Sequence, residues 1–312
     1  MIEAKGLTKH YGAKVAVDDL SFDVRPGVVT GFLGPNGSGK STTMRMIMGL
    51  DAPNSGVATV NGRHYHDLEW PLHEVGALLE AKAIHPGRSA HAHLQMLAET
   101  NHISNRRVDE VLGIVGLSAV AGQRAGKFSL GMGQRLGIAA ALLGDPDVFL
   151  FDEPVNGLDP DGIRWVRNLL QSLAREGRTV FVSSHLMSEM AVTADEVVII
   201  GRGRLIAQVS IDQLLGESSQ AFVRVRSPQL GQLKSALDAE GASTSTEDDG
   251  SLSVRGVDEV AIGELAAKLS ITLHELAPQT ASLEEAFMAL TEGSVEFHGS
   301  SSDQIPPTGD LS

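Results

Sequence analysis

The sequence predicts an α/β fold in which a parallel β-sheet is covered on both faces. Short apolar runs alternate with stretches of helical pattern, and strands buried on both faces of a sheet have this continuous apolar composition. The runs are 28–33, 148–151, 180–183 and 197–200. Three of them are followed by Gly34, by Asp152-Glu153 and by His185. Because ligands bind at the carboxyl ends of strands in open α/β sheets, we expect the functional site there.

Length and composition limit the class of protein. With 312 residues, 42% of them hydrophobic, the chain can bury one large α/β core and a small accessory domain. No stretch approaches the roughly 18 apolar residues of a membrane-spanning helix, and Met1–Lys5 lacks the layout of a signal peptide. We therefore expect a cytoplasmic protein that meets a membrane only through a partner. The absence of cysteine excludes disulfides and thiol catalysis.

The net charge of −14 is unevenly distributed, and most of the acidic excess lies beyond residue 210. Proteins that bind nucleic acid through its phosphate backbone cluster Lys and Arg, and no such stripe occurs in this sequence. We therefore expect no nucleic-acid partner.

Two further regions accompany the predicted sheet. Residues 86–147 have a helical pattern and begin at Pro86-Gly87, which predicts an inserted helical subdomain. Beyond residue 215 the pattern predicts a small α+β domain with βαββαβ order. Its expected elements are 222–226, 229–239, 242–246, 252–255, 257–269 and 271–276. A helix over 282–291 follows, in which Ser282 and Glu285 have the spacing of a capping box.

These patterns divide the chain into three parts. We expect a main domain over residues 1–215, an accessory domain over 216–292 and a disordered tail over 293–312. In the tail Ser, Gly, Pro and Asp dominate, and such a composition cannot support a packed core.

A glycine-rich loop after the first apolar run carries the clearest chemistry. Its residues are Gly34-Pro35-Asn36-Gly37-Ser38-Gly39-Lys40-Ser41-Thr42. They match the pattern G-x-x-x-x-G-K-[ST] between a buried strand and a helix expected at 42–48, the setting of a phosphate-binding loop. Backbone N–H groups and the helix N-terminus hold phosphate oxygens in such a loop. Lys40 then bridges the outer phosphates, and the Ser41 hydroxyl joins the shell of Mg²⁺.

The second apolar run ends in two adjacent carboxylates. Side chains alternate along a strand, so Asp152 and Glu153 point to different faces and can serve different roles. We expect Asp152 to hold Mg²⁺, directly or through water, and Glu153 to polarise the water that attacks the γ-phosphate. Alone, such a pair is more often the start of a solvated loop, but the phosphate-binding loop favours the catalytic interpretation.

Residues 127–135 resemble the signature segment of ATP-binding cassette (ABC) proteins, whose usual form is Leu-Ser-Gly-Gly-Gln. Ser129 and Gly131 stand at the key positions, whereas Leu130 and Met132 depart from the commonest residues. A Ser hydroxyl and a Gly N–H at the start of a helix form an anion site. The resemblance implies that this site binds the γ-phosphate held by an opposite subunit, so that ATP lies between two copies.

Other positions follow the order of the ABC family. Tyr11 corresponds to the aromatic residue that stacks on adenine, Asn156–Asp159 to the D-loop with its Asp159, and His185 to the switch histidine. The resemblance covers about residues 1–215. It implies a P-loop NTPase (RecA-like) core with an antiparallel β subdomain and the inserted helical subdomain.

One departure from the family concerns the Q-loop. Glu80 stands where most members have Gln, so a carboxylate is offered near the γ-phosphate and the metal, and Glu80 joins Ser41 and Asp152 as a candidate Mg²⁺ ligand. With the segment 282–287 and the variant signature, the sequence is similar to the exporter ATPases of the bacitracin- and daunorubicin-resistance type.

The histidines between residues 64 and 102 raise the alternative of a resident metal site. Metal sites need converging ligands, and these histidines span two predicted subdomains. His91 and His93 do not share a helix face. The sequence therefore disfavours a metal centre at these histidines.

The resemblance implies an ATP-binding and ATP-hydrolysing transporter subunit with ATP and Mg²⁺ as cofactors. It implies export of a small molecule through a separate integral membrane permease, pairing with a second nucleotide-binding subunit as a homodimer, and a place at the cytoplasmic face of the membrane. The alternative is a soluble ABC-type ATPase with a non-transport role. Such a protein acting on ribosomes usually carries two cassettes, and one acting on DNA a long coiled-coil insertion; this sequence has neither. A nonhydrolytic nucleotide sensor is disfavoured by Glu153.

Overall fold

The structure is a computed structural model of the chain. It describes residues 1–80, 83–217, 222–247, 249–279 and 283–291. The predicted tail at 293–312 and the predicted helix cap Ser282 lie outside the described residues. We refer to residues 1–217 as the main domain and to residues 222–279 as the small domain.

A six-stranded sheet forms the centre of the main domain in the described part of the chain. In sheet order its strands are β5 (Val75–Leu78), β6 (Val148–Asp152), β7 (Thr179–Ser183), β3 (Val29–Leu33), β8 (Glu196–Gly201) and β9 (Arg204–Ser210). The first five strands are parallel, and β9 pairs with β8 antiparallel. The predicted α/β fold with its buried parallel strands is therefore confirmed.

Alternate residues of these strands contribute to two separate cores. Phe149 and Phe151 of β6 pack with the helices on one face, whereas Leu150 packs on the other face with the second sheet. On that second face, the rings of Phe32 and Phe181 lie 4.9 Å apart between centroids. Burial on both faces explains why the sequence of these strands is continuously apolar rather than alternating.

An antiparallel sheet covers the second face. Its strands are, in sheet order, β2 (Lys14–Val24), β1 (Ile2–Tyr11) and β4 (Ser55–Val60). Leu7 and Leu20 of these strands are fully buried in the core that they share with the central sheet. This is the antiparallel β subdomain that the resemblance implied.

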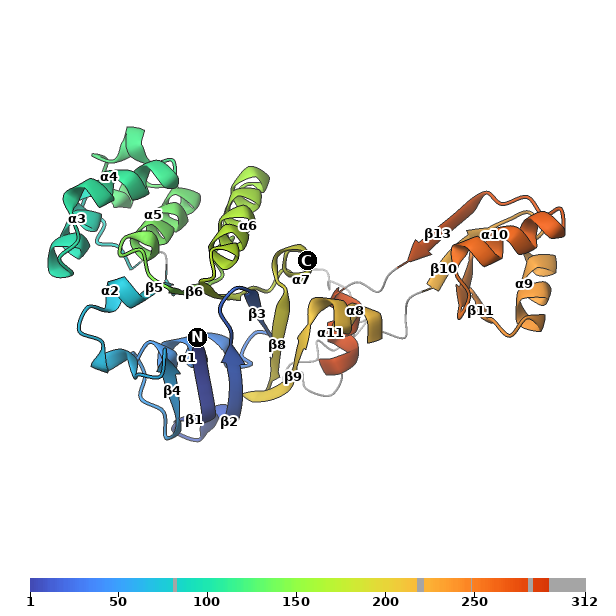
Figure 1. Ribbon diagram of the computed structural model, residues 1–312, viewed down its shortest axis with the longest axis horizontal. Helices are drawn as coiled ribbons and strands as arrows, with labels where there is room; N and C mark the ends of the chain where they lie inside the picture. The colour runs from blue at the N-terminus through green and yellow to red at the C-terminus, as the bar shows by residue number, and fades with distance from the viewer. Residues whose placement is uncertain (81–82, 218–221, 248, 280–282, 292–312) are drawn as a thin grey trace, which may run out of the picture.

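The helices of the main domain take three positions. Helix α1 (Lys40–Ile47) follows β3 and packs between the two sheets, beginning two residues before the predicted 42–48. Helices α2 (Pro71–Glu74), α3 (Ala90–Thr100), α4 (Asn105–Ile114) and α5 (Leu130–Leu142) lie between β4 and β6 in the chain, and α3 to α5 form the inserted helical group (Figure 1). Helices α6 (Pro160–Arg175), α7 (Met187–Thr193) and α8 (Ile211–Glu217) follow.

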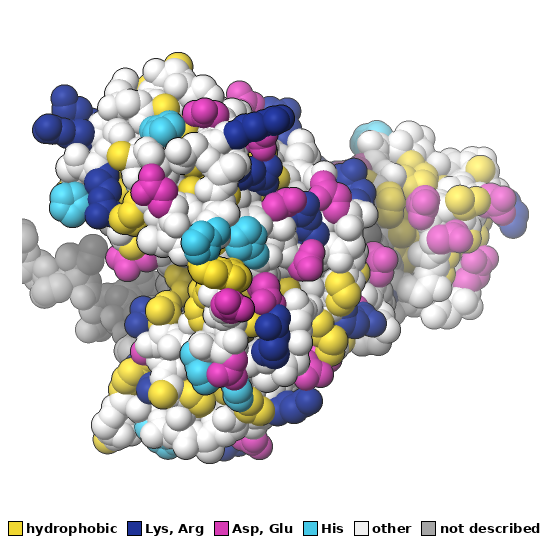
Figure 2. Space-filling model, turned by 60° about the vertical axis from the view of Figure 1, so that its left-hand side comes forward, with side chains coloured by type: hydrophobic (Ala, Val, Ile, Leu, Met, Phe, Trp, Pro, Cys, Tyr) yellow, Lys and Arg dark blue, Asp and Glu magenta, His cyan; other side chains and the backbone are white. Residues whose placement is uncertain are grey.

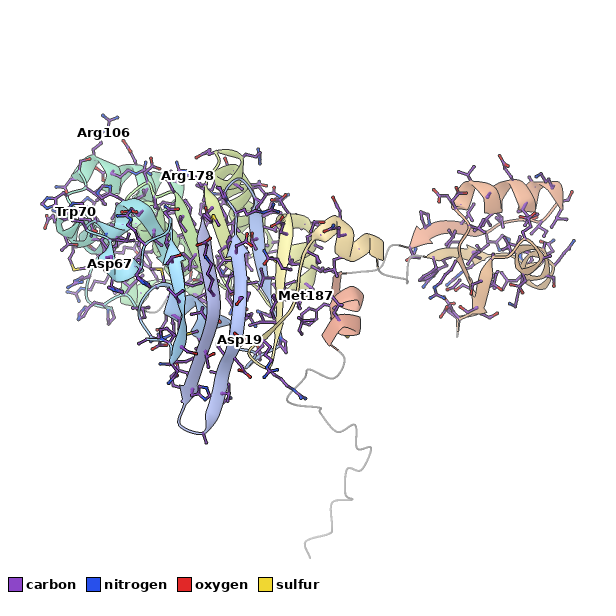
Figure 3. All side chains as sticks on the ribbon, turned by 60° about the horizontal axis from the view of Figure 1, so that its bottom comes forward. Asp19, Asp67, Trp70, Arg106, Arg178 and Met187 are labelled. Atoms are coloured by element: carbon purple, nitrogen blue, oxygen red, sulfur yellow. The ribbon has the colours of Figure 1, made fainter. Side chains whose placement is uncertain are left out.

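The small domain has the predicted βαββαβ order and a core of its own. Its elements are β10 (Phe222–Arg226), α9 (Leu230–Ala239), β11 (Ser243–Thr246), β12 (Leu252–Arg255), α10 (Glu259–Lys268) and β13 (Glu275–Gln279). The four strands are antiparallel in the order β11-β12-β10-β13. Figures 1 and 3 both show this domain standing apart from the helical group.

The last strand of the small domain differs from the prediction of 271–276. Helix α10 ends at Lys268. Ser270, two residues later, has a left-handed φ of 55°, and the Ile271 N–H then donates to the main-chain oxygen of Ala266. This hydrogen bond turns the Ile271 side chain into the small core, where it is 7% exposed. The apolar residue that suggested a strand therefore belongs to a helix end.

The final described helix, α11 (Leu283–Thr291), returns to the main domain. Leu283 and Phe287 are buried in the same core as Ile211 and Leu214 of α8. Helix α11 also contacts α7, and Figure 3 shows Met187 of α7 close to it. In the chain, the small domain thus lies between α8 and α11, and both of these helices pack on the main domain.

The surface seen in Figure 2 carries basic and acidic side chains side by side rather than in a patch of one sign. Within the described residues, no helix is both long enough and apolar enough to span a membrane.

Candidate nucleotide-binding site

The glycine-rich loop connects the end of β3 to the start of α1, as its sequence predicts. Gly39 precedes the helix with a φ of 105°, and a Cβ there would lie 2.5 Å from the main-chain oxygen of Ala16. No other residue tolerates both this backbone and this contact. The loop is therefore wrapped tightly around the first turn of α1, with its peptide groups next to the helix N-terminus.

Lys40 lies buried under this loop. Its Nζ donates to the main-chain oxygens of Gly34 at 2.6 Å and of Pro35 at 3.3 Å. Burial lowers the pKa of the Lys40 ammonium, while the negative charges of Glu153 and Asp152 oppose that shift. The ammonium thus lies inside the loop, between its carbonyls and the two carboxylates.

The two carboxylates follow β6 and are fixed by the neighbouring strand β7. Asp152 accepts a hydrogen bond from the Ser183 hydroxyl. The main-chain N–H of Glu153 lies 3.1 Å from the Ser183 Oγ and 3.3 Å from the Ser183 main-chain oxygen. Glu153 has a φ of 51°, a backbone conformation that is uncommon for a non-glycine residue. Strand β6 therefore ends at Asp152, and the chain turns sharply at Glu153.

His185 meets the second carboxylate. It follows β7 in the chain, and its Nδ1 lies 2.6 Å from Oε2 of Glu153. The imidazole is about half exposed, while the Glu153 side chain is 25% exposed. The two residues that the sequence marked as catalytic are thus in direct contact at the carboxyl ends of adjacent strands.

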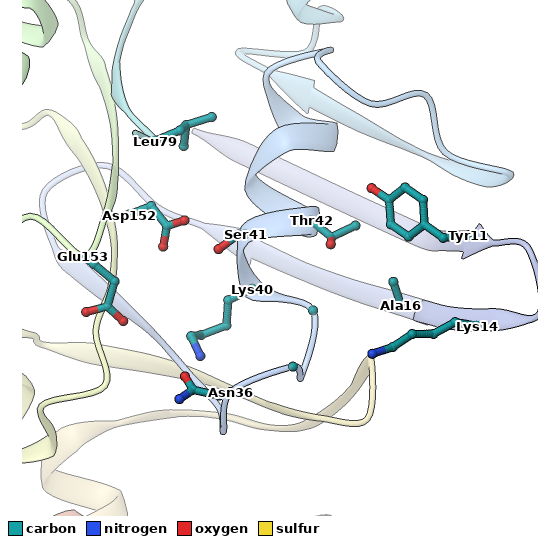
Figure 4. Close-up of a pocket in the computed structure, with 12 residues that line it drawn as sticks. Tyr11, Lys14, Ala16, Asn36, Lys40, Ser41, Thr42, Leu79, Asp152 and Glu153 are labelled. Carbon is teal, nitrogen blue, oxygen red and sulfur yellow. The ribbon is translucent and has the colours of Figure 1, made fainter. Parts of the chain in front are cut away.

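A cavity of about 480 Å³ joins the loop, the carboxylates and the predicted adenine residue (Figure 4). Its lining residues are Tyr11, Lys14, Ala16, Asn36, Gly37, Gly39, Lys40, Ser41, Thr42, Leu79, Asp152 and Glu153. In Figure 4 the carboxylates and Tyr11 lie on opposite sides of the first turn of α1. The Tyr11 ring is half exposed and its hydroxyl donates to Asp51 at 2.9 Å. A polar end and an aromatic end suit a ligand that carries phosphates and a flat base.

The signature residues lie at a different place. Ser129 caps α5, since its Oγ accepts from the Met132 N–H at 3.2 Å. It lines a second cavity of about 430 Å³ together with Ile84, Phe128 and others. This cavity shares no lining residue with the first. Within one chain, the described residues do not bring the phosphate-binding loop and the signature to a common cavity.

The start of the signature helix packs on the loop that follows Glu153. Gly157 has a φ of 74°, which favours glycine, and a Cβ there would lie 2.1 Å from Cδ2 of Leu130, so the Leu130 side chain packs directly on this loop. Asp159 caps α6 by accepting from the Gly162 N–H at 2.8 Å. The D-loop is therefore held between the signature helix and the start of α6.

Comparison with known proteins places the chain in a family. A family model described as "ABC transporter" matches residues 17–156. An uncharacterized ABC transporter ATP-binding protein of Bacillus subtilis, YhcH, is 36% identical over 302 residues, which cover 93% of this chain and 96% of that protein. The chain belongs to the ABC transporter ATP-binding proteins. It therefore binds and hydrolyses ATP as the ATPase subunit of a transporter.

Further comparisons refine this picture of the ABC ATPase. The bacitracin transport ATP-binding protein BcrA of Bacillus licheniformis is 42% identical over 217 residues, 69% of this chain and 71% of that protein. A solved ATP-binding subunit of an ABC transporter is 28% identical, covers 70% of this chain and 92% of its own length, and has a TM-score of 0.64. A second family model, described as a domain of unknown function, matches residues 221–284.

The residues of this ABC ATPase fit a magnesium ion beside the phosphates. The Ser41 hydroxyl and the Asp152 carboxylate line the same cavity, and Mg²⁺ binds hard oxygen ligands while it keeps several waters. Glu80, the third candidate, is exposed and does not line the cavity; its neighbour Leu79 does. Among the described residues, no three His, Cys, Asp or Glu side chains converge into a metal site.

Most sequence-predicted residues of the ABC ATPase lie around the first cavity, and the exceptions have clear positions. Gly34, Pro35 and Ser38 belong to the loop but do not line the cavity. Sequence reasoning missed Lys14 and Ala16, which enter from β2. No motif marks them, because their position follows from how the antiparallel sheet packs beside the loop.

Proposed function

We propose that this ABC ATPase drives export of a small molecule through a separate membrane permease, as one of two nucleotide-binding subunits. The observation that carries the proposal is the separation of two half-sites. The phosphate-binding loop and the carboxylates share one cavity, whereas Ser129 lines another. A second copy that presents Ser129 and Gly131 to the first cavity would complete the site. We expect this pair to be a homodimer.

Within each completed site, the residues of this chain have separate proposed roles. Lys40 and the loop N–H groups hold the phosphates. Ser41 and Asp152 hold Mg²⁺, which would neutralise phosphate charge when bound. Tyr11 stacks on the base.

For the chemical step, we propose that Glu153 orients the attacking water and that His185 fixes its carboxylate. The contact of 2.6 Å between His185 Nδ1 and Glu153 Oε2 supports this pairing. A carboxylate held by a neighbour, and directed toward the phosphates, needs little reorganisation before it accepts a proton.

The names of the relatives support a proposal for the class of cargo. BcrA is named as a bacitracin transport ATP-binding protein, and it is 42% identical to this chain over 217 residues. We propose an antibiotic, drug or lipid-like molecule as the cargo, and a peripheral position at the cytoplasmic face of the membrane through the permease. The second candidate, a soluble ABC-type ATPase with a non-transport role, has less support, because the relatives reported above carry transport in their names.

A mixing experiment tests the shared site. Lys40→Ala removes the phosphate lysine, and Ser129→Arg blocks the signature surface, so neither variant alone should hydrolyse ATP. A mixture contains dimers with one intact composite site and should recover ATPase activity well above the sum of its components. A mixture that stays as inactive as each variant would contradict the two-copy site.

The transport arm uses cells instead of purified protein. Cells that carry Lys40→Ala in place of the wild-type chain should accumulate more of a labelled bacitracin-type peptide. Equal accumulation would contradict this cargo class, while the mixing experiment would still report on the ATPase.

A further inference from the structure

Gln134 lies in the signature helix α5, but its side chain points away from the signature surface into the core. It is 5% exposed. Its Nε2 donates to the main-chain oxygen of Glu153 at 2.9 Å. Its Oε1 is buried and has no hydrogen-bond partner among the described residues. A buried amide with one unsatisfied end disfavours folding. The hydrogen bond from Nε2 to Glu153 is therefore the interaction that gives a buried Gln134 a structural role.

The contact occurs at a strained point of the chain. Glu153 has a left-handed φ of 51°, and strained backbone persists only where its surroundings hold it. Ser183 holds the Glu153 N–H from β7, and Gln134 holds the Glu153 carbonyl from α5. The two bonds hold the main chain of this residue from two elements, and so fix the point from which its carboxylate extends.

We propose that Gln134 is a positioning residue for Glu153, which it ties to the signature helix. The inference rests on the proposed role of Glu153 in orienting water. Gln134 lies five residues after Ser129 in the chain. The helix that would present the signature to the partner's nucleotide therefore also anchors Glu153 of its own subunit. Gln134 does not line the cavity, so its effect must pass through Glu153.

The expected effect is on turnover and not on nucleotide affinity. A misplacement of about 1 Å in a reacting group can cost on the order of 100-fold in rate. Removal of the Gln134 donor should therefore lower kcat by about 10- to 100-fold and leave KM for ATP within about twofold. The loop, Lys40 and Tyr11 are untouched by the change.

Gln134→Met is the test variant. Methionine has similar length and fills irregular space, and it removes both the donor and the unsatisfied acceptor. We therefore expect the melting temperature to change by less than about 4 °C. The matched control is Gln208→Met on β9, since the Gln208 amide also donates to a main-chain oxygen, that of Asp23 at 2.8 Å. It lies outside the nucleotide cavity and should keep kcat within about twofold.

The purified full chain is assayed for kcat, KM and melting temperature, with Glu153→Gln measured beside it. A kcat of Gln134→Met within about threefold of wild type would overturn the proposal, as would a rise in KM with kcat unchanged. So would a kcat loss that Gln208→Met reproduces. If Glu153→Gln hydrolyses ATP normally, the proposed role of Glu153 is wrong; if only Gln134→Met is normal, this inference alone is wrong.

A second variant covers a failure of Gln134→Met to fold. Gln134→Leu keeps a buried side chain of similar volume without charge, and it cannot donate to the Glu153 carbonyl. Its kcat should also fall by at least about tenfold, and wild-type turnover in this variant would overturn the proposal.

Discussion

The sheets of the main domain and the small domain are both covered by helices, yet they use their polar side chains differently. At the carboxyl edge of the parallel sheet, Asp152 and Glu153 face an open cavity. Between β11 and β12 of the small domain, Asp249 accepts from the Ser251 hydroxyl at 2.6 Å and from Arg226 at 2.5 Å, and Glu247 accepts from Ser253 at 2.6 Å. Asp249 and Glu247 are thus held by neighbours in their own turn, whereas Asp152 and Glu153, which Ser183 and His185 contact, also line a cavity that a ligand can enter.

The difference teaches how topology creates a site. Parallel strands bring several carboxyl ends to one edge, so the residues that follow β3, β6 and β7 meet there. Antiparallel strands alternate in direction, and each edge receives both strand starts and strand ends. An edge of that kind closes with short turns whose side chains satisfy one another.

The substitution Glu153→Gln has the largest expected effect and tests this contrast first. Loss of the water-orienting carboxylate should lower kcat by about 100-fold or more, within the range of general-base catalysis, while ATP binding persists. Size measurement by light scattering should show dimers that accumulate with ATP. Turnover near the wild-type rate would mean that the open carboxylate at this edge is not the base.

The second test asks whether helix α11 stabilises the main domain. Leu283→Ala removes a buried side chain between α11 and the main domain and should lower the free energy of unfolding by about 2–5 kcal/mol. Leu290→Ala on the same helix is the control, because Leu290 is 41% exposed. Differential scanning calorimetry measures both variants. Equal melting temperatures would show that α11 does not stabilise the main domain.

The third test concerns acid stability of the small domain. Hydrogen bonds from Ser251, with Arg226 beside them, lower the pKa of the Asp249 carboxyl well below its usual range. A carboxyl whose pKa is lower in the folded state than in the unfolded state stabilises the fold at pH values above its unfolded-state pKa. This stabilisation is lost as the pH falls through the folded-state pKa. Below about pH 4, close to the pKa of an unfolded aspartate, wild-type protection should therefore begin to fall.

Hydrogen exchange of peptides from residues 249–255 measures this protection in the full chain. Asp249→Asn should exchange faster than wild type at neutral pH, and the two should converge on acidification. Peptides from β6 serve as the internal control. Parallel curves at all pH values would show that the Asp249 charge does not stabilise this hairpin.

The smallest expected effect is that of Glu80→Gln. We propose that Glu80 contributes to the Mg²⁺ dependence of turnover, but its side chain is exposed and lies outside the cavity. An exposed charge contributes under about 1 kcal/mol, so the half-activating Mg²⁺ concentration should change by no more than about fivefold. A magnesium titration of ATPase activity measures it. Superimposable titrations would remove Glu80 from the metal site.

Much of the fold and site follows from local sequence. The apolar strands with Gly34 and Asp152 at their ends predicted the parallel sheet and its active edge, because burial on both faces leaves a simple signal. The glycine-rich pattern also predicted where the loop lies, because the backbone at Gly39 has a conformation that requires glycine. These features depend on residues close together in the chain.

The parts that sequence did not predict depend on contacts between distant segments. Gln134 reaches a carbonyl 19 residues away, and a lone glutamine in a helix carries no sign of such a partner. The position of α11 against α7 likewise depends on the path of the chain through the small domain. Ile271 misled the strand assignment, because an apolar residue after a helix can be part of the helix end instead of a strand.

The return of α11 to the main domain has a practical consequence for engineering. Since the segment between α8 and α11 begins and ends on the same host surface, it resembles an inserted module more than an appended one. A foreign domain with closely spaced termini, such as a fluorescent reporter, is therefore a natural replacement for residues 222–279, and a chimera of this kind would retain the helix that a simple truncation removes.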